Sequence, residues 1–423
     1  MNRSPVRTFL CALPFLAAFA GCTGAGDGRT RITFWALGAE GEHVAKLMPA
    51  FSKRHPEIDV RVQIIPWNAA HEKLLTAFAG ESLPDMCQLG NTWIPEFRTL
   101  NAIEDLTPWV AASGSVRGSS YFPGIWDTNV IDSLLYGVPW YVDTRVLFYR
   151  SDLLAAAGYA KPPESWEEWF DLSAKMQKRF PGSYANFFST NNEWAPPVIL
   201  GLEKGSSLLK ENNTAGDFSG PEFTAAMHVF YAFFRNGWAP VKTAQIVSVY
   251  QAFAEGFFAM YITGPWYIGE FMNRLPDSLQ GVWMTAPLPA PGGGIGVSLA
   301  GGSSLVMFSA SKHKAAVWSL IEYLSEPEQQ LEFYRLTGDL PARVETWHDS
   351  SLSHNRYAAA FFRQLNNVRA TPKVPEWEQI AQKVREYAEL ITMDQFTVEE
   401  GLRALDREVN VILEKRRWLL HGR

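Results

Sequence analysis

Residues 31–89 alternate between short strand patterns and helix patterns, and this alternation restricts the fold more than any other feature. Residues 31–35, 58–65 and 84–89 have the apolar or alternating character of strands. Residues 42–55 and 69–79, which lie between them, repeat apolar side chains at helical spacing. Strands joined in this way by helices form a parallel sheet with helices packed on its faces. We therefore predict an α/β fold.

Length and composition set the class of protein. A chain of 423 residues is too long for one small core, which favours two lobes. The apolar fraction of 47% and the charged fraction of 19% are typical of a packed globular protein. A net charge of −6, with no Lys/Arg block before the last ten residues, argues against a nucleic-acid partner. The His residues are scattered without metal-ligand spacing, so we expect no metal site.

The amino-terminal segment has the pattern of an export signal. Arg3 and Arg7 precede an apolar run at 9–20, which is too short to span a bilayer stably. The run ends in a sequence that resembles a bacterial lipobox, so we predict a signal peptide at 1–22 and lipidation at Cys22. Residues 23–30 have the composition of a flexible tether. The protein is therefore expected in the periplasm or cell envelope; the alternative is plain secretion after cleavage near Ala20.

A second informative stretch lies at 252–271. Its pattern predicts a helix that ends at Gly256, a buried strand at 257–263, a break at Gly264-Pro265 and a new helix that begins at Trp266. In open α/β sheets, ligands bind beyond the carboxyl ends of the strands. Trp266 is therefore a candidate ligand platform, and the alternative is a core residue that caps the sheet.

Several motifs occur in the same order as in one known family. They are Phe34-Trp35, Gly80-x-x-x-Pro84-Asp85, Tyr136-Gly137-x-Pro139, Phe253-x-x-Gly256-x-x-Ala259-Met260-x-x-x-Gly264-x-Trp266 and Gly338-x-Leu340-Pro341. Together they resemble the extracellular solute-binding proteins of ABC sugar importers, of the maltose- and trehalose-binding kind. The resemblance runs from about residue 30 to the end of the chain.

The resemblance implies a periplasmic-binding-protein-like fold, with two α/β lobes around a cleft. The amino-terminal lobe would comprise 31–140 and 302–342, and the carboxyl-terminal lobe 145–298 and 345–423. Hinge crossings would lie near 141–144, 299–301 and 343–344. Such a protein would be a monomer without a cofactor or catalytic activity. It would close on its ligand and deliver it to the permease subunits in the membrane.

The predicted site combines aromatic plates with polar anchors. In the extended segment before Arg150, Tyr141 and Asp143 lie on one side. An aromatic ring can cover the apolar C–H face of a sugar, and a neighbouring carboxylate can accept hydrogen bonds from its hydroxyls. For the full set, the resemblance and the loop positions together indicate stacking by Trp93, Trp140, Tyr141 and Trp266, hydroxyl anchoring by Glu40, Asn91, Asp143 and Arg369, and backbone contacts at Gly301 and Gly302. For Glu40 the alternative is a solvated carboxylate in the first turn of a helix.

The expected ligand is a small oligosaccharide, and an α-linked glucoside such as maltose or trehalose fits the resemblance best. Two alternatives stay open. The first is the same scaffold with another solute, such as glycerol phosphate or a peptide. A secreted glycoside hydrolase would need two carboxylates about 5–10 Å apart, and Glu40 with Asp143 is the pair that the sequence offers.

Overall fold

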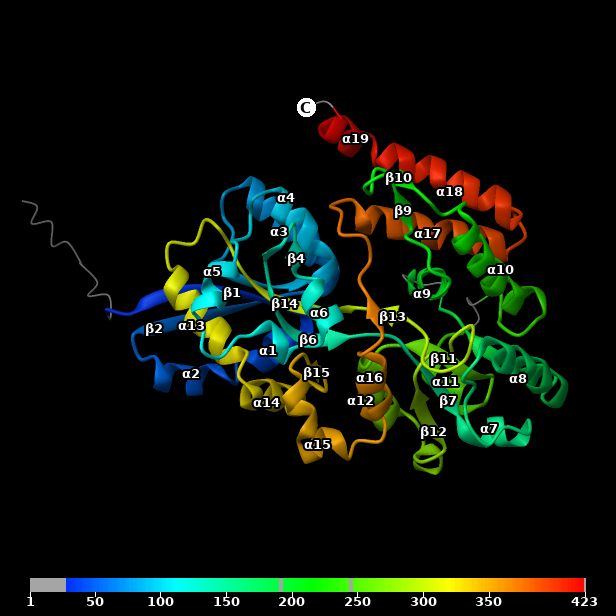
Figure 1. Cartoon of the computed structure of the whole chain (residues 1–423). Helices are drawn as coiled ribbons and strands as arrows, with labels where there is room; N and C mark the ends of the chain where they lie inside the picture. Colours follow the sequence, from blue (N-terminus) through cyan, green and yellow to red (C-terminus); the bar gives the residue numbers. More distant parts are fainter. Residues whose placement is uncertain (1–27, 190–192, 243–245, 422–423) are drawn as a thin grey trace, which may run out of the picture.

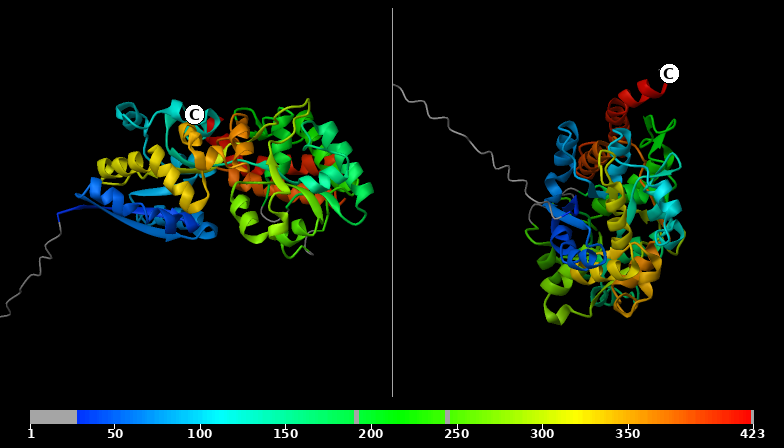
Figure 2. Two further views of the ribbon diagram at one scale, coloured as in Figure 1. Left: turned by 90° about the horizontal axis from the view of Figure 1, so that it is seen from below. Right: turned by 90° about the vertical axis from the view of Figure 1, so that its left-hand side faces the viewer.

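The computed structural model describes residues 28–189, 193–242 and 246–421, and it has two lobes, each with its own central sheet (Figure 1). Helices and sheets are mixed in both lobes, which confirms the predicted α/β class. The lobes lie side by side along the long axis of the molecule (Figure 2). The predicted signal peptide, Cys22 and most of the tether lie outside the described residues.

The first lobe is organised around a six-stranded sheet of order β15-β6-β14-β3-β1-β2. β1 runs parallel to β2 and β3, whereas β14 and β15 pair antiparallel with their neighbours. The strands are β1 (Thr30–Leu37), β2 (Ile58–Ile65), β3 (Met86–Gly90), β6 (Val138–Asp143), β14 (Gly301–Met307) and β15 (Leu340–Pro341). The three strands expected near the amino terminus are therefore present and form the parallel part of this sheet.

The helix expected at 42–55 is two helices instead. α1 spans Gly38–Val44 and α2 spans Met48–Arg54. Pro49 lies in the first turn of α2, where a missing N–H costs no helical hydrogen bond, so the chain begins a new helix there. α1 begins directly after β1 and carries Glu40 in its first turn.

The second lobe has a four-stranded sheet of order β12-β7-β11-β8. Its strands are β7 (Val146–Arg150), β8 (Tyr184–Phe187), β11 (Phe258–Thr263) and β12 (Trp283–Ala286). The helices around it include α8 (Trp166–Arg179), α9 (Ala195–Glu203), α10 (Pro221–Arg235), α12 (Trp266–Arg274), α17 (Trp377–Thr392) and α18 (Val398–Ile412). α8 begins after Ser165, whose hydroxyl caps the helix by accepting a hydrogen bond from the Glu168 N–H at 3.1 Å.

Two of the passages between the lobes are short. β6 ends at Asp143 in the first sheet, and β7 begins at Val146 in the second. The return passes through β13 (Ser298–Leu299), which pairs in parallel with β16 (Val368–Arg369) before β14 begins. The close spacing of these strands places the ends of β6 and β14 at the junction of the two lobes.

The third passage lies later than the predicted 343–344. Arg343 still pairs with Tyr121, and its guanidinium donates to the Ser325 carbonyl at 3.0 Å in the first lobe. The second sheet is reached only at Tyr357, whose carbonyl accepts from Thr285 Oγ1 at 2.7 Å and whose ring stacks on Trp283. The buried Arg343 side chain thus holds the chain on the first lobe past the predicted crossing.

Candidate functional site

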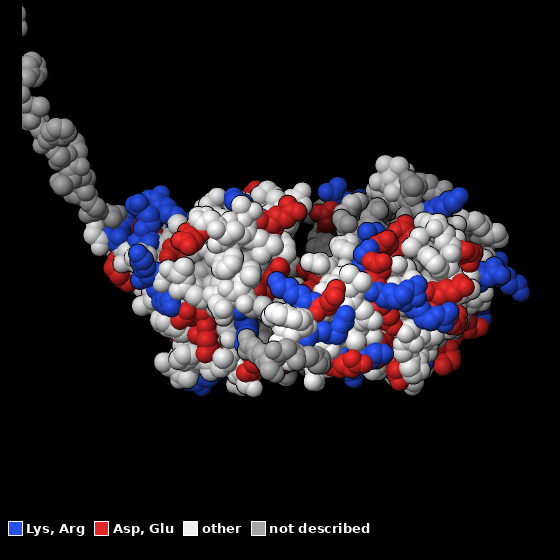
Figure 3. Space-filling view, turned by 90° about the horizontal axis from the view of Figure 1, so that it is seen from above, with Lys and Arg blue, Asp and Glu red and all other residues white. Residues whose placement is uncertain are grey.

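The polar and aromatic groups singled out in the sequence meet where β6 leaves the first lobe. Tyr141 and Asp143 lie at the end of β6, and Trp266 begins α12 in the second lobe. The space-filling surface is hollowed between the lobes when seen from above (Figure 3). The junction therefore brings together groups from both sheets beside an opening to solvent.

Tyr141 links three strands of the first lobe to α1. Its O–H donates to Glu40 Oε1 at 3.1 Å, and its oxygen accepts from Ser303 Oγ at 3.0 Å and from Gln88 Nε2 at 3.1 Å. Burial, followed by the nearby Glu40 charge, raises the pKa of Tyr141 well above its ordinary value. The phenol therefore stays neutral and keeps Glu40 in place as a hydrogen-bond acceptor.

A charged group spans the first passage between the lobes. Arg145 pairs with Asp143, approaches Glu193 Oε2 at 3.5 Å, and places its guanidinium 4.7 Å from the centre of the Trp266 ring. Burial and the Glu193 charge raise the pKa of Asp143, while Arg145 opposes the shift. Trp266 is 42% exposed, which is unusual for so large an apolar ring. One face of this tryptophan is thus held by a cation while much of its surface stays accessible.

Arg145 was missed by the sequence analysis, although its position carried a signal. Residues 141, 143 and 145 follow one another at the two-residue period of an extended segment. An arginine at this spacing continues the side that already has a tyrosine and an aspartate. The role of Arg145 is to neutralise Asp143 and to cover Trp266.

Trp93 belongs to an aromatic wall of the first lobe. Its ring contacts Trp67 with a centroid separation of 5.8 Å and His71 with one of 5.0 Å. Trp67 Nε1 donates to Glu40 Oε2 at 3.2 Å, which connects the wall to the Tyr141 cluster. Hydrogen bonding to Glu96 raises the pKa of His71. The wall combines flat apolar surface with hydrogen-bonded carboxylates.

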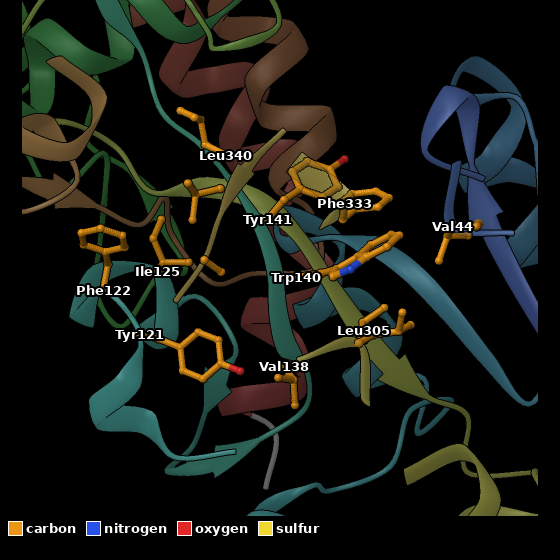
Figure 4. Close-up of a cluster of buried hydrophobic side chains, with 14 of the residues drawn as sticks. Val44, Tyr121, Phe122, Ile125, Val138, Trp140, Tyr141, Leu305, Phe333 and Leu340 are labelled. Carbon is orange, nitrogen blue, oxygen red and sulfur yellow. The ribbon is translucent and has the colours of Figure 1, made fainter. Parts of the chain in front are cut away.

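The prediction that Trp140 faces the cleft is wrong. Trp140 is 1% exposed and stacks on Phe333 with ring centres 4.2 Å apart, inside the core of the first lobe (Figure 4). The pairing of β6 with β14 is irregular here: Tyr141 pairs with Ser303 and Pro139 with Ser304, which leaves Trp140 without a partner in the register. The Trp140 ring therefore turns into the core, 5.9 Å from the ring of Tyr141. Trp140 stabilises the lobe and does not line the opening.

The remaining predicted residues have contacts within the protein. Asn91 is buried and donates to the Ala300 carbonyl at 2.8 Å, which ties β3 to the second passage. Arg369 lies on β16, and its guanidinium donates to the Leu202 carbonyl at 3.5 Å. Gly301 and Gly302 lie so close to β6 that a Cβ atom would approach the Asp143 and Tyr141 carbonyl oxygens to 2.3 and 2.2 Å. These four residues shape the junction, and their contact with a ligand stays a prediction.

Asp339 is a second residue that the sequence analysis missed. It directly precedes β15, whose Leu340 pairs with Val142 of β6, so Asp339 lies at the same end of the sheet as Asp143. Burial raises the pKa of Asp339 to about 7, and the Glu40 and Asp143 charges act in the same direction. The available signal was the turn Gly338-Asp339-Leu340-Pro341. The family motif there consists of the glycine and the Leu-Pro pair, and Asp339 occupies its variable position.

Asp339→Asn is expected to change the pH dependence of unfolding. The raised pKa means that the folded protein holds a proton between about pH 4 and 7 that the unfolded chain releases. Stability from this group is therefore greatest at low pH and is lost as the pH rises toward 7. As the pH rises from about 4 to 7, the free energy of unfolding of the parent should therefore fall relative to that of the Asn variant. Urea titration at each pH measures both values. The exposed Asp277→Asn serves as control, and equal pH slopes for all three proteins would contradict the assignment.

Further contacts connect the lobes beside the aromatic wall. Thr92 Oγ1 donates to Glu378 Oε1 at 2.6 Å, although Thr92 follows β3 and Glu378 belongs to α17. Lys373 Nζ donates to the carbonyls of Asp127 and Val130 at 2.6 and 3.0 Å. These bonds hold the second lobe against the first in the observed arrangement.

Thr92→Val should loosen this arrangement. A hydrogen bond to a charged group contributes about 1.5–3 kcal/mol, so its loss should shift the balance between lobe arrangements by roughly tenfold or more. We expect a larger radius of gyration in X-ray scattering of the unliganded variant. Ser319→Ala, which removes a bond confined to one helix, should leave scattering unchanged. Identical curves for Thr92→Val and the parent would show that the bond does not hold the lobes.

The described residues were also compared with what a second pocket, a metal site or a membrane-spanning helix would need. A hollow of about 680 Å³ is lined by Tyr250, Gln251, Glu255 and Arg274 in the second lobe. Within the described ranges, no cluster of three or more His, Cys, Asp or Glu side chains is arranged to hold a metal ion. None of the helices in that part of the chain combines the length and apolarity needed to cross a membrane.

The family model and the solved structures both identify the chain as a solute-binding protein. The family model of the bacterial extracellular solute-binding proteins matches residues 35–331, which is more than half of the chain. The sugar-binding protein MalE of Xanthomonas citri is 46% identical and has a TM-score of 0.90, with 93% of this chain and 100% of that chain covered. The GacH receptor of Streptomyces glaucescens is 22% identical, with a TM-score of 0.76 over 91% of this chain and 99% of its own, and it supports the fold alone.

Curated relatives agree at lower identity. A putative binding protein of Brucella abortus is 25% identical over 372 residues, which cover 86% of this chain and 89% of the relative. The diacetylchitobiose binding protein DasA of Streptomyces coelicolor is 24% identical over 326 residues, covering 76% of this chain and 74% of DasA. These proteins are named as binding proteins and not as enzymes.

Proposed function

Because this chain belongs to the family of bacterial extracellular solute-binding proteins, we propose that it captures a small oligosaccharide between its two lobes. Closure of the lobes about the hinge would enclose the sugar, and the loaded protein would deliver it to the permease subunits of an ABC importer. A monomer suffices for this role, and Cys22 would carry the lipid that keeps the protein at the membrane. The role requires binding and release, without catalysis.

The observation that carries the proposal is the pairing of Trp266 with the Asp143–Arg145 group. An exposed aromatic face can cover the C–H face of a sugar ring, while neighbouring carboxylate and guanidinium groups bind its hydroxyls. Tyr141 and Glu40 supply a second polar cluster from the first lobe. Groups on both sides of the first passage can therefore contact one ligand, as hinge closure requires.

We propose an α-linked glucoside such as maltose or trehalose as the ligand. The structure at 46% identity is titled as a sugar-binding protein, and several curated relatives are named for oligosaccharides. Those names include arabino- and galactooligosaccharides, so the relatives differ in the sugar for which they are named. The α-glucoside linkage is the most specific part of the proposal. A neutral sugar suits a junction where Arg145 already pairs with Asp143, because a phosphate would need further cations.

The hydrolase alternative is less well supported by the contacts. Glu40 accepts hydrogen bonds from Tyr141 and Trp67, and Asp143 is paired with Arg145. Both carboxyl groups are thus held by hydrogen-bond donors of the protein itself, whereas a glycosidase needs one of its two carboxyls free to donate a proton to the glycosidic oxygen.

A thermal-shift panel tests the proposal. The panel contains mono-, di- and trisaccharides, glycerol phosphates and peptides, and chromatography of the same mixtures reports any hydrolysis. A ligand at about 100 Kd should stabilise the protein by about 2.7 kcal/mol, a shift of a few degrees at this chain length. Stabilisation by one or two disaccharides without products would support the proposal. A response only to a phosphate or a peptide, or the appearance of monosaccharide products, would overturn it.

A further inference from the structure

The first lobe has a partly exposed tryptophan that the sequence analysis did not single out. Trp67 closely follows β2: Pro66, which has no N–H to donate to a neighbouring strand, comes after the last residue of β2, and Trp67 begins α3 (Trp67–Ala79). β1, β2 and β3 run in parallel, so Trp67 lies at the same edge of the sheet as the residues that follow β1 and β3. Ligands of open α/β sheets bind at this edge, and the Trp67 ring is 37% exposed there.

Three contacts fix the orientation of this ring. Gly38 has φ +54° and lies directly against the indole, since a Cβ atom on Gly38 would come within 2.5 Å of Trp67 Cδ1. Trp67 Nε1 donates to the two carboxylate oxygens of Glu40 at 3.3 and 3.2 Å, and the ring meets Trp93 nearly edge-on with a centroid separation of 5.8 Å. The part of the ring that stays exposed is therefore already held in place before a ligand arrives, which lowers the cost of binding.

A row of polar side chains leads from Trp67 in the first lobe to Trp266 in the second. Each member of the row contacts the next or belongs to the same strand, and the members in order are Glu40, Tyr141, Asp143 and Arg145. We call these four residues the polar row. An aromatic ring thus lies at each end of the polar row, and the groups between the rings bind hydroxyls. This arrangement suits a ligand with an apolar face near each end and hydroxyls along its length.

We propose that Trp67 is a second stacking platform and that the site takes a linear oligosaccharide longer than a disaccharide. One sugar ring lies over Trp266, as in the proposed function on which this inference rests. The next ring binds the polar row, and a further ring lies over the exposed part of Trp67, where the indole covers its C–H face. Glu40, held by Trp67 and Tyr141, accepts hydrogen bonds from the hydroxyls of that further ring.

The competing role for Trp67 is to orient Glu40 without touching the ligand. In that role only the indole N–H matters, because it is the group that donates to the carboxylate. In a stacking role the flat apolar surface matters as well. Phenylalanine separates the two roles, since its side chain keeps an aromatic face but has no N–H to donate.

Calorimetric titration with maltose and maltotriose tests the inference. The measured quantity is the ratio of the trisaccharide affinity to the disaccharide affinity, which cancels any damage that a variant does to the whole site. The parent should bind maltotriose at least about tenfold more tightly, because removing roughly 55 Å² of apolar surface from water is enough for that gain. The ratio should fall to about one in Trp67→Ala and stay close to the parent value in Trp67→Phe. Trp418→Ala, at a 72% exposed tryptophan on α19 (Glu414–His421), is the matched control and should keep the parent ratio.

The outcomes separate this inference from the proposed function. Equal affinities of the parent for both sugars, binding of trehalose alone, or an unchanged ratio in Trp67→Ala would overturn the inference, and the proposed function would stand. A ratio lost equally in Trp67→Ala and Trp67→Phe would also overturn it and assign Trp67 to the positioning of Glu40. No response to any sugar would overturn the proposed function and this inference with it. Thermal unfolding of each variant shows whether the fold is intact.

Discussion

Trp266→Ala is expected to weaken binding of the preferred disaccharide by at least about tenfold, which is about 1.4 kcal/mol. Two losses combine in this variant. The sugar loses an aromatic plate of large contact area, and Arg145 loses the ring that covers its guanidinium at 4.7 Å. Isothermal titration calorimetry gives the affinity directly. Because Trp266 is 42% exposed, its truncation should alter the unfolding temperature far less than it alters binding.

The control for this prediction is Trp418→Ala. Trp418 is also an exposed tryptophan, but it lies on α19 and contacts none of the groups at the junction. Its replacement should leave the sugar affinity unchanged. If Trp266→Ala and Trp418→Ala bind the disaccharide equally well, Trp266 is not part of the site, and the sheet-capping interpretation of this residue stands.

Gly302→Ala is expected to lower the free energy of unfolding by about 2 kcal/mol or more. Gly302 has φ +137°, a conformation that costs a residue with a side chain about 1–3 kcal/mol. In addition, the new Cβ would lie 2.2 Å from the Tyr141 carbonyl oxygen, so β14 must move away from β6. Since β6 carries Tyr141 and Asp143, sugar affinity should fall together with stability.

Urea unfolding of Gly302→Ala and Gly292→Ala provides the comparison. Gly292 has open space around its Cα, and its φ lies outside the left-handed range, so its alanine variant should unfold like the parent. Equal unfolding midpoints for Gly302→Ala and Gly292→Ala would show that the two strands can separate at no cost. The close approach of β14 to β6 would then not be what positions Tyr141 and Asp143.

Local patterns in the sequence were enough to predict the parallel strands and the strand–break–helix unit at Trp266. β1, β2 and β3 are short apolar segments separated by helices, and such segments have few alternative pairings. The antiparallel strands β14 and β15 follow much later in the chain and join the same sheet through contacts of long range. Their positions came from the resemblance, because residue patterns alone do not show which distant strands pair.

The candidate site was predictable only in part, for the same reason. The two-residue period that singled out Tyr141 and Asp143 also applies to Arg145, whereas the burial of Trp140 depends on an irregularity in the pairing of β6 with β14, which local spacing does not show. Asp339 is near Asp143 because β15 pairs with β6, a contact between segments almost two hundred residues apart. The third passage was placed too early because the buried contacts of Arg343 depend on Tyr121 and Ser325, which lie far away in sequence.

The most direct test of the central claim is a crystal structure of the protein with the disaccharide that gives the largest thermal shift. The account predicts that the sugar lies between the lobes, with one ring over Trp266 and hydroxyls within hydrogen-bond distance of Asp143 and Arg145. A sugar bound elsewhere would contradict it, for instance in the hollow beside Tyr250 and Arg274 of the second lobe, with the junction filled only by water.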